Sequence, residues 1–221
     1  RTAPQAAVLD RAAFNVFMSD RARGRGAEYI PGTRVVAIDT RGDQALVTIA
    51  SQEVELQLKA KAVVVATGFN SFLTETLGLG KPGDLAGGSQ AEVETTGVEE
   101  VEVYLGQRIA PDFFAWLVPT SSNRAVAGLL SQHNPREQLR NFLAFLRETH
   151  KIRSIDVPLT SGAVPLQALP RTYADRLLVT GTAAGLVKPL TGGGIYFGLL
   201  SADIAAAVLH KAICHKDLSH R

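Results

Sequence analysis

Apolar and polar residues alternate with different periods along the chain, and the changes of period predict where strands and helices lie. Residues 54–60 alternate strictly between apolar and polar side chains. With the apolar stretches 34–39 and 45–50 they predict an antiparallel meander of three strands that has one solvated face. Residues 62–66 are instead an unbroken run of Ala and Val, which is typical of a strand buried on both faces of a parallel sheet.

A second group of strands and one amphipathic helix follow in the middle of the chain. Asn134, Pro135 and Glu137 form a helix start signal, because Pro fits the first helical position and Glu suits the first turn. The helix is expected to run to about Thr149 and to cover an antiparallel sheet. We expect the Gly- and Pro-rich stretch 81–89 to be a loop or a boundary between lobes. The strands of the sheet are predicted at 91–95, 98–105, 113–118 and 124–130.

Two further helices are predicted near the ends of the chain. Asp10 is a suitable N-cap for a helix over 11–23. Near the C-terminus, a buried strand at 176–180 leads through a Gly-rich loop into a helix over 195–211, which is apolar nearly all round. We expect that helix to be packed in the interior of the protein.

The composition excludes several classes of protein. Hydrophobic residues make up 46% and charged residues 20% of the 221 residues, which is ordinary for a globular chain and unlike a disordered one. The net charge of +2 comes without a basic cluster, so no nucleic-acid partner is expected. Cys214 is the single cysteine and the five histidines lack metal-ligand spacing, so we expect no disulfide, iron–sulfur cluster or metal.

The expected location follows from two of these features. A single cysteine fits a reducing compartment, and we expect the protein to be cytoplasmic. The most apolar segment, 195–209, is shorter than a bilayer span and contains Asp203, so no transmembrane helix is expected.

The glycines between the last strand and the last helix are the candidate chemical site. Gly192, Gly193 and Gly194 stand immediately before the helix, where backbone N–H groups and the helix dipole favour an anionic ligand. Glycines remove side chains from the approach, which suits a flat ring or a pyrophosphate. The competing interpretation is a tight strand-to-helix turn in which the glycines serve packing alone.

The stretch from Gly181-Thr-Ala-Ala-Gly185 to Lys188-Pro-Leu-Thr-Gly-Gly-Gly-Ile195 resembles the second flavin-binding motif of the geranylgeranyl reductase family, within the p-hydroxybenzoate hydroxylase-like FAD superfamily. Arg11, followed by Phe14 and Asn15, resembles the start of the family's helix near the FAD phosphates. Val-Val-Val-Ala-Thr-Gly at 63–68 resembles its third dinucleotide-site segment. Phe-Ala-Trp-Leu-Val-Pro at 114–119 resembles a stretch of its substrate domain.

This resemblance implies an α/β fold of mixed α+β character and an FAD-dependent oxidoreductase that reduces double bonds of a prenyl chain on a lipid or isoprenoid. It implies a partial Rossmann-like FAD/NAD(P)-binding lobe over 1–85 and 176–221, and an antiparallel-sheet substrate domain over 86–175. NAD(P)H or ferredoxin would donate electrons, and peripheral contact with a membrane stays open. The implied cofactor residues are Arg11, Thr67, Gly68, Gly181, Thr182, Pro189, Gly192, Gly193, Gly194 and Ile195, and the implied substrate residues are Phe114, Trp116 and Pro119.

The sequence departs from the family pattern in three ways. Thr182 stands where the superfamily has an Asp that binds the ribityl chain, so weaker FAD binding is expected. Leu130 stands where the reductases often have a second glycine, and Asp112 lies in a turn that would suit Gly. No Gly-x-Gly-x-x-Gly follows a strand near the beginning, so the chain is interpreted as an internal piece of a longer flavoprotein that holds FAD poorly alone.

Two alternative functions stay open. The stretch Phe-x-Trp-x-Val-Pro at 114–119 is also similar to the Trp-x-Trp-x-Ile-Pro pattern of flavin-dependent halogenases, so a halogenase or monooxygenase is one alternative. The other is an inactive lipid-binding remnant that no longer binds FAD. No residue is identified as a catalytic acid or base.

Overall fold

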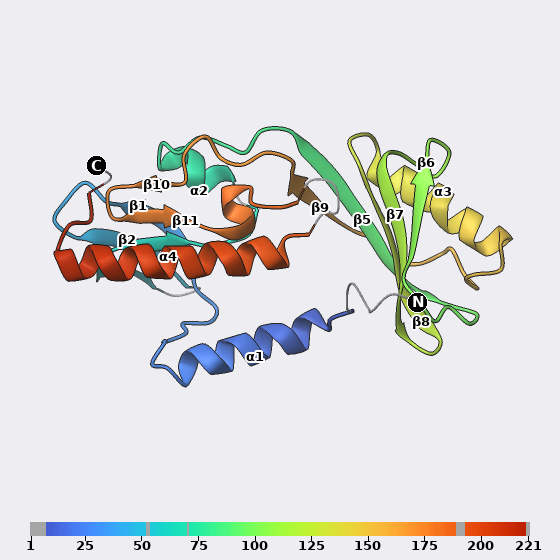
Figure 1. The fold of residues 1–221 in the computed structure, drawn as a ribbon, viewed down its shortest axis with the longest axis horizontal. Helices are drawn as coiled ribbons and strands as arrows, with labels where there is room; N and C mark the ends of the chain where they lie inside the picture. The colour runs from blue at the N-terminus through green and yellow to red at the C-terminus, as the bar shows by residue number, and fades with distance from the viewer. Residues whose placement is uncertain (1–7, 52–53, 70, 189–192, 220–221) are drawn as a thin grey trace.

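The computed structural model describes residues 8–51, 54–69, 71–188 and 193–219. It confirms a mixed helix and strand fold with antiparallel sheets. Figure 1 shows the elements gathered at two ends of an elongated molecule. One end holds α4 with the strands β1, β2, β10 and β11, and the other holds α3 with β5 to β8. The division at residues 85 and 176 stays a prediction.

Helix α1 (Arg11–Arg23) begins as the sequence predicts. Asp10 Oδ1 accepts hydrogen bonds from the backbone N–H groups of Ala12 and Ala13, at 2.9 and 3.0 Å. These bonds satisfy two of the amides that a helix start leaves without a partner. No residue of α1 is buried, so the rest of the described chain adds little packing to this helix.

The predicted meander forms from β1 (Arg34–Asp39), β2 (Ala45–Ala50) and β3 (Glu55–Ala60), in the sheet order β1-β2-β3. Its core lies on β2, where Ala45 and Ile49 are buried. The expectation of one solvated face is wrong for β3, because Leu56 and Leu58 are 56% and 40% exposed. β3 is the edge strand, and the described elements do not cover its apolar side.

The parallel pairing is confirmed between β4 (Val63–Val65) and β11 (Leu177–Val179), with Val65 opposite Val179. β10 (Tyr173–Ala174) extends this sheet on the other side of β11. The expectation that β4 is buried on both faces is wrong: Val65 is 3% exposed but Val64 is 42% exposed. Only one face of β4 is packed by the described chain.

Helix α4 (Ile195–His215) follows the short 3-10 helix η1 (Gly181–Ala184), and α2 (Ser71–Thr76) follows β4. The expectation that α4 is packed in the interior is wrong, since only Ala205 is buried in it. Its large side chains are exposed because the described elements cover a single stripe of the helix. The exposed fractions include 57% for Ile204 and 52% for Val208.

The length of α4 also corrects the sequence analysis. The apolar segment continues to His215, so the helix has 21 residues and is long and apolar enough to cross a membrane by length and composition. In the part of the chain that the structure describes, it is the one helix that meets these criteria of length and hydropathy. Only 6% of its most apolar stretch is buried. A single such helix is weak evidence, because core helices of soluble proteins meet the same criterion.

The second lobe is a five-stranded antiparallel sheet with one helix. α3 (Pro135–Glu148) packs on one face through Phe142, Leu143 and other apolar side chains. Its start is confirmed, although Asn134 adopts φ 47° and its side chain makes no capping bond. In sheet order the strands are β6 (Glu102–Gly106), β7 (Ala110–Ser121), β8 (Arg124–Ser131), β5 (Leu85–Glu94) and β9 (Thr160–Pro165).

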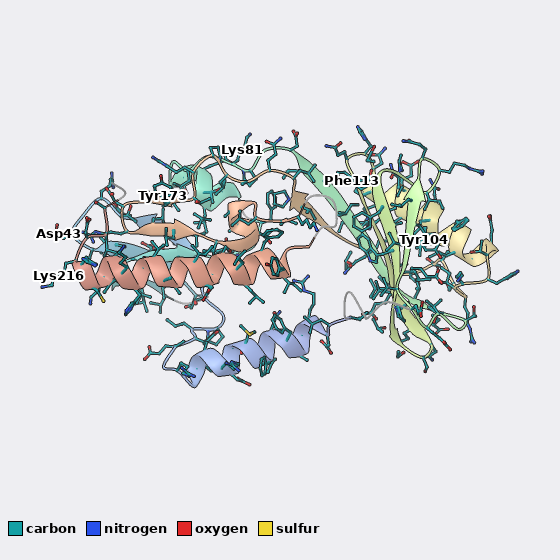
Figure 2. The ribbon with its side chains drawn as sticks, in the orientation of Figure 1. Asp43, Lys81, Tyr104, Phe113, Tyr173 and Lys216 are labelled. Atoms are coloured by element: carbon teal, nitrogen blue, oxygen red, sulfur yellow. The ribbon has the colours of Figure 1, made fainter. Side chains whose placement is uncertain are left out.

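The start of β5 differs from the prediction, and the packing of Tyr104 could not be predicted from the sequence. The stretch 81–89 is a loop only as far as residue 84, because β5 begins at Leu85 and contains Gly87 and Gly88. Figure 2 labels Tyr104 on the side of the sheet next to α3, and its ring packs edge-on against Phe142 with ring centroids 5.0 Å apart. Its hydroxyl donates to Glu102.

Candidate cofactor and substrate site

The carboxyl ends of β4 and β11 meet at one edge of the parallel sheet. The Thr180 N–H donates to the Val65 carbonyl at 3.0 Å, which holds the two strand ends together. Thr67 and Gly68 follow β4, and Gly181 follows β11. This edge is where ligands bind in open parallel sheets. Thr67 is exposed, and Gly68 has φ 72° with none of the described residues within 4 Å of the position a Cβ would take.

Gly181 ties η1 to the first turns of α4. Its N–H donates to Ser201 Oγ at 3.0 Å, and Ser201 Oγ donates to the Gly198 carbonyl at 3.0 Å. Gly181 has φ 59°, and a Cβ there would lie 3.7 Å from Gly198 Cα. The left-handed conformation favours glycine at this position.

The N-terminus of α4 presents backbone donors next to Thr182. Gly194 is the N-cap, and because it has no side chain it cannot cap the helix start with one. The Gly198 N–H donates to the Gly194 carbonyl at 2.8 Å. The backbone N–H groups of residues 195–197 therefore have no acceptor within the helix. A Cβ on Gly194 would lie 3.3 Å from Thr182 Oγ1, so the hydroxyl and the helix start lie together.

The remaining predicted cofactor residues lie either at the start of α4 or outside the described residues. Gly193 forms an isolated antiparallel bridge with Lys188, whose N–H donates to the Gly193 carbonyl at 3.2 Å. Ile195 is 41% exposed at the first turn of α4. Pro189 and Gly192 lie outside the described residues.

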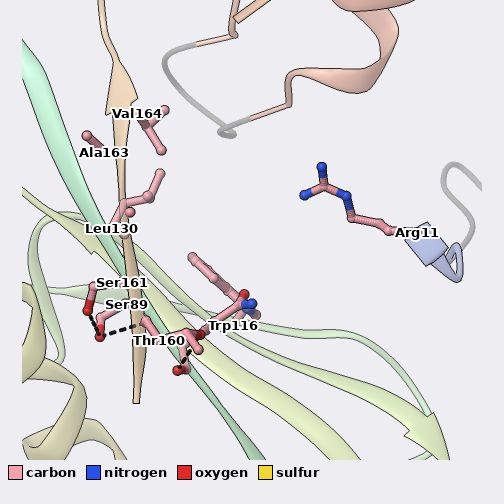
Figure 3. Close-up of a pocket in the computed structure, with 11 residues that line it drawn as sticks. Arg11, Ser89, Trp116, Leu130, Thr160, Ser161, Ala163 and Val164 are labelled. Atoms are coloured by element: carbon pink, nitrogen blue, oxygen red, sulfur yellow. Dashed lines mark hydrogen bonds between the residues drawn. The ribbon is translucent and has the colours of Figure 1, made fainter. Parts of the chain in front are cut away.

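Arg11 faces the second lobe from the start of α1. It lines a cavity together with residues of β5, β7, β8 and β9, and Figure 3 shows its guanidinium reaching into the space in front of the sheet. Among the described residues its side chain makes no hydrogen bond or ion pair. A cation in the first turn opposes the helix dipole, so this position suits an anionic partner.

The cavity lies on the face of the five-stranded sheet opposite α3 and has a volume of about 400 Å³. Trp116, Leu130 and Val164 form its sheet side, with Arg11 across from them (Figure 3). Arg11 is the one charged residue among those that line it. The remaining lining residues are Gly88, Ser89, Gln90, Thr160, Ser161, Gly162 and Ala163.

Trp116 lies flat on the sheet because β8 has a glycine opposite it. Trp116 pairs with Gly128 across β7 and β8, and a Cβ on Gly128 would come within 2.4 Å of the indole ring. Phe114 lies beside Trp116 with ring centroids 5.7 Å apart. The structure therefore brings Phe114 and Trp116 together on the cavity side of the sheet.

Pro119 is not brought into this cavity. It pairs with Ala125, which belongs to the core packed against α3. Because side chains alternate along a strand, Pro119 points to the opposite face from Trp116.

Asp112 anchors the loop where β8 ends and lies outside the cavity. Its Oδ2 accepts from the Ser131 hydroxyl at 2.9 Å and from the Gln132 N–H at 3.1 Å, and lies 3.3 Å from His133 Nδ1. The hydrogen bonds from Ser131 and then His133 lower the pKa of Asp112. The carboxylate thus supports a turn that the sequence analysis expected to suit Gly.

Sequence reasoning missed most of the floor of the cavity. Gly88 was assigned to a loop, and no local signal marked Thr160, Gly162 or Val164. The register of the sheet brings them together: Gly88 stands between Leu130 on β8 and Gly162 on β9. Two adjacent glycines in a stretch that can also extend as a strand were the one available signal.

These residues fit FAD as a cofactor. FAD carries phosphates, ribityl hydroxyls and a flat ring that needs bare backbone at close range. The described chain offers uncapped amides at the start of α4, the Thr182 hydroxyl beside them and the unpaired Arg11 guanidinium. Gly68 leaves open space at the neighbouring strand end.

Comparison with known proteins supports FAD as the cofactor. Residues 2–207 match the family model described as "FAD dependent oxidoreductase". Digeranylgeranylglycerophospholipid reductase of Methanocaldococcus jannaschii is 32% identical, over 97% of this chain and 58% of that protein. Digeranylgeranylglycerophospholipid reductase 2 of Methanothermobacter thermautotrophicus is 32% identical, over 93% of this chain and 55% of that protein. The chain thus spans less than two thirds of the length of these curated relatives.

Solved structures give the same result for the fold. A geranylgeranyl bacteriochlorophyll reductase-like protein from Thermoplasma acidophilum matches with a TM-score of 0.85 and 26% identity, covering 98% of this chain and 59% of that one. The flavin-dependent halogenase CmlS matches with a TM-score of 0.72 and 19% identity, covering 97% of this chain and 43% of that one, which shows the fold alone. The match to the family model over nearly the whole chain places this protein in the family of FAD-dependent oxidoreductases.

Proposed function

We propose that the chain is the part of an FAD-dependent reductase that receives a prenyl lipid and presents its double bonds to the cofactor. The observation that carries this proposal is the cavity on the uncovered face of the five-stranded sheet, where Trp116, Leu130 and Val164 face the Arg11 guanidinium. An apolar wall with a single charge opposite suits a long hydrocarbon chain beside an anionic cofactor. The names of the similar reductases favour the same substrate class.

The FAD site would be held by backbone and short side chains. The amides at the start of α4 would bind the edge of the ring, where the positive end of the helix favours negative charge. Thr182 would bond the ribityl chain, and Arg11 would pair with a phosphate. When reduced, FAD supplies the hydride equivalent that saturates an alkene. No described side chain in the cavity is assigned as the proton donor.

The substrate side is positioned by the sheet. Trp116 and Phe114 offer flat apolar surface, and Leu130 closes one end of the floor. Together they would exclude water from the hydrocarbon chain and hold it in front of the cofactor site. The cofactor lobe is joined to this sheet through the segment after β9, where the Leu169 N–H donates to the Ala184 carbonyl of η1 at 3.0 Å.

The cellular setting belongs to this proposal as well. A prenyl lipid substrate requires access to a membrane surface, so we propose a cytoplasmic protein with peripheral membrane contact. NAD(P)H or ferredoxin would reduce the FAD.

Anaerobic product analysis tests the proposed reaction. The protein is incubated with FAD, dithionite and a geranylgeranyl lipid, and the product is examined by mass spectrometry. A gain of H2 per reduced double bond is expected, and it should depend on FAD. Absence of turnover together with a halogenated or hydroxylated product in air would assign a halogenase or monooxygenase instead. Absence of protein-bound flavin absorbance, after unbound FAD has been removed by gel filtration, would assign an inactive remnant.

A further inference from the structure

Three glycines lie on the cavity face of the sheet, and the surrounding side chains explain two of them. A Cβ on Gly128 would meet the Trp116 ring at 2.4 Å, and a Cβ on Gly88 would lie 3.3 Å from Leu130 Cδ2. These positions give room to neighbouring side chains. Gly162 differs, because no atom of the residues that the structure describes lies within 4 Å of the place its Cβ would take.

The backbone does not require glycine at position 162 either. Gly162 is absent from the glycines with positive φ, so its conformation suits any L-residue. It pairs with Gly88 in a regular antiparallel register on β9, which is one of the two edge strands of this sheet among the described residues. Glycine inside a strand is less stable than Ala by about 0.5–1 kcal/mol, so folding alone favours a side chain there.

The missing side chain leaves a bare strip at the floor of the cavity. The Leu130 side chain covers Gly88, so the uncovered backbone lies at Gly162. Thr160 and Val164 lie two residues before and after Gly162, on the same face of the sheet. In the register of the sheet, one row across the strands contains Gly162, Gly88 and Leu130, and the next row on the same face contains Thr160, Gln90, Gly128 and Trp116. A thin, flexible hydrocarbon chain can lie against bare backbone there, and a side chain would occupy the same volume.

We propose that Gly162 is the specificity-determining residue of the cavity, and that its bare backbone admits the prenyl chain across β9. This inference rests on the proposed substrate class. It predicts that side-chain volume at position 162 weakens ligand binding while leaving the fold as stable as before, or more stable. A glycine with a purely structural role would show the reverse.

Trp116 provides the assay, since it is the single tryptophan of the chain and lines the same cavity. The probe is geranylgeraniol, added to the full 221-residue chain while the indole fluorescence is recorded. Gly162→Ala and Gly162→Val are compared with Gly42→Val. Gly42 lies in the bend between β1 and β2, away from the cavity, and has only an ordinary contact of 3.7 Å at its Cβ position.

The wild type and Gly42→Val should show the same saturable change in Trp116 fluorescence. Gly162→Val should weaken binding at least about tenfold, as even one methylene shifts binding in an apolar pocket by about that factor. Gly162→Ala should lie between them, and urea unfolding should show no loss of stability for either variant. Equal binding by Gly162→Val and the wild type would overturn the inference and leave the substrate class standing. No response in the wild type would overturn both.

Discussion

Substitution of Gly128 by Ala tests the packing that places Trp116 on the wall of the cavity. The added Cβ would lie 2.4, 2.5 and 2.8 Å from three atoms of the indole ring, whereas ordinary contact begins at 3.4 Å. The ring would have to lift by about 1 Å to restore contact, and it is half-buried between the sheet and the cavity. Forcing extra volume into a packed position of this kind costs about 1–3 kcal/mol.

Gly162→Ala is the matched control, because it adds the same methyl group on the same face of the sheet, where no described residue lies within 4 Å of the new Cβ. Replacing Gly with Ala lowers the conformational entropy of the unfolded chain by the same amount in both variants. The difference between their free energies of unfolding therefore isolates the contact with Trp116. It is measured by urea unfolding followed by far-UV circular dichroism.

A double-mutant cycle with Trp116→Ala completes the test. Ala lacks the ring atoms that meet the new methyl group, so in that background Gly128→Ala should cost less than about 0.5 kcal/mol. The refuting result is additivity: equal costs of Gly128→Ala with Trp and with Ala at position 116 would show that the ring does not lie on Gly128.

Three further predictions address other parts of the molecule. Burial raises the pKa of Glu102, but hydrogen bonds from Lys151 and Tyr104 lower that pKa overall below the ordinary value of a Glu side chain. The carboxylate therefore stabilises the fold near neutral pH, and this stabilisation is lost as the pH falls through its lowered pKa. The melting temperature of Glu102→Gln should fall less steeply on acidification than that of the wild type, and parallel curves would contradict this. Gly185→Ala should lose about 1–3 kcal/mol in urea unfolding, since φ is 72° and the Cβ would lie 2.3 Å from the Gln167 carbonyl oxygen; unchanged stability would refute it. Thr182→Asp should bind FAD more tightly by about 1 kcal/mol in a fluorescence titration, because a carboxylate makes a charge-assisted bond to a ribityl hydroxyl, and equal or weaker affinity would show that residue 182 does not bind the ribityl chain.

Local signals predicted the elements of this fold well. The Asp10 N-cap, the Pro135 helix start and the strict alternation in 54–60 each depend on neighbours a few residues away. The same is true of the glycines around Gly181, whose spacing to the last helix carries the cofactor motif. These features could be read without knowing how the chain folds back on itself.

Burial could not be predicted in the same way. Val64 and the apolar side chains of α4 suggest an interior position by their chemistry, yet they are exposed because covering them depends on which elements pack nearby. The cavity was missed for a related reason: Gly88 and Gly162 are 74 positions apart in the numbering and meet only through the register of β5 and β9. Pro119 was assigned to the substrate side by its motif, and strand alternation places it on the other face.

An FAD titration followed by flavin fluorescence tests most directly whether the start of α4 holds the cofactor. The wild type and Gly42→Val should quench the fluorescence saturably and equally, whereas Gly193→Val, which adds a branched side chain where the ring would approach, should lose the quenching. Saturable binding of equal strength by Gly193→Val and the wild type would contradict the cofactor site described above.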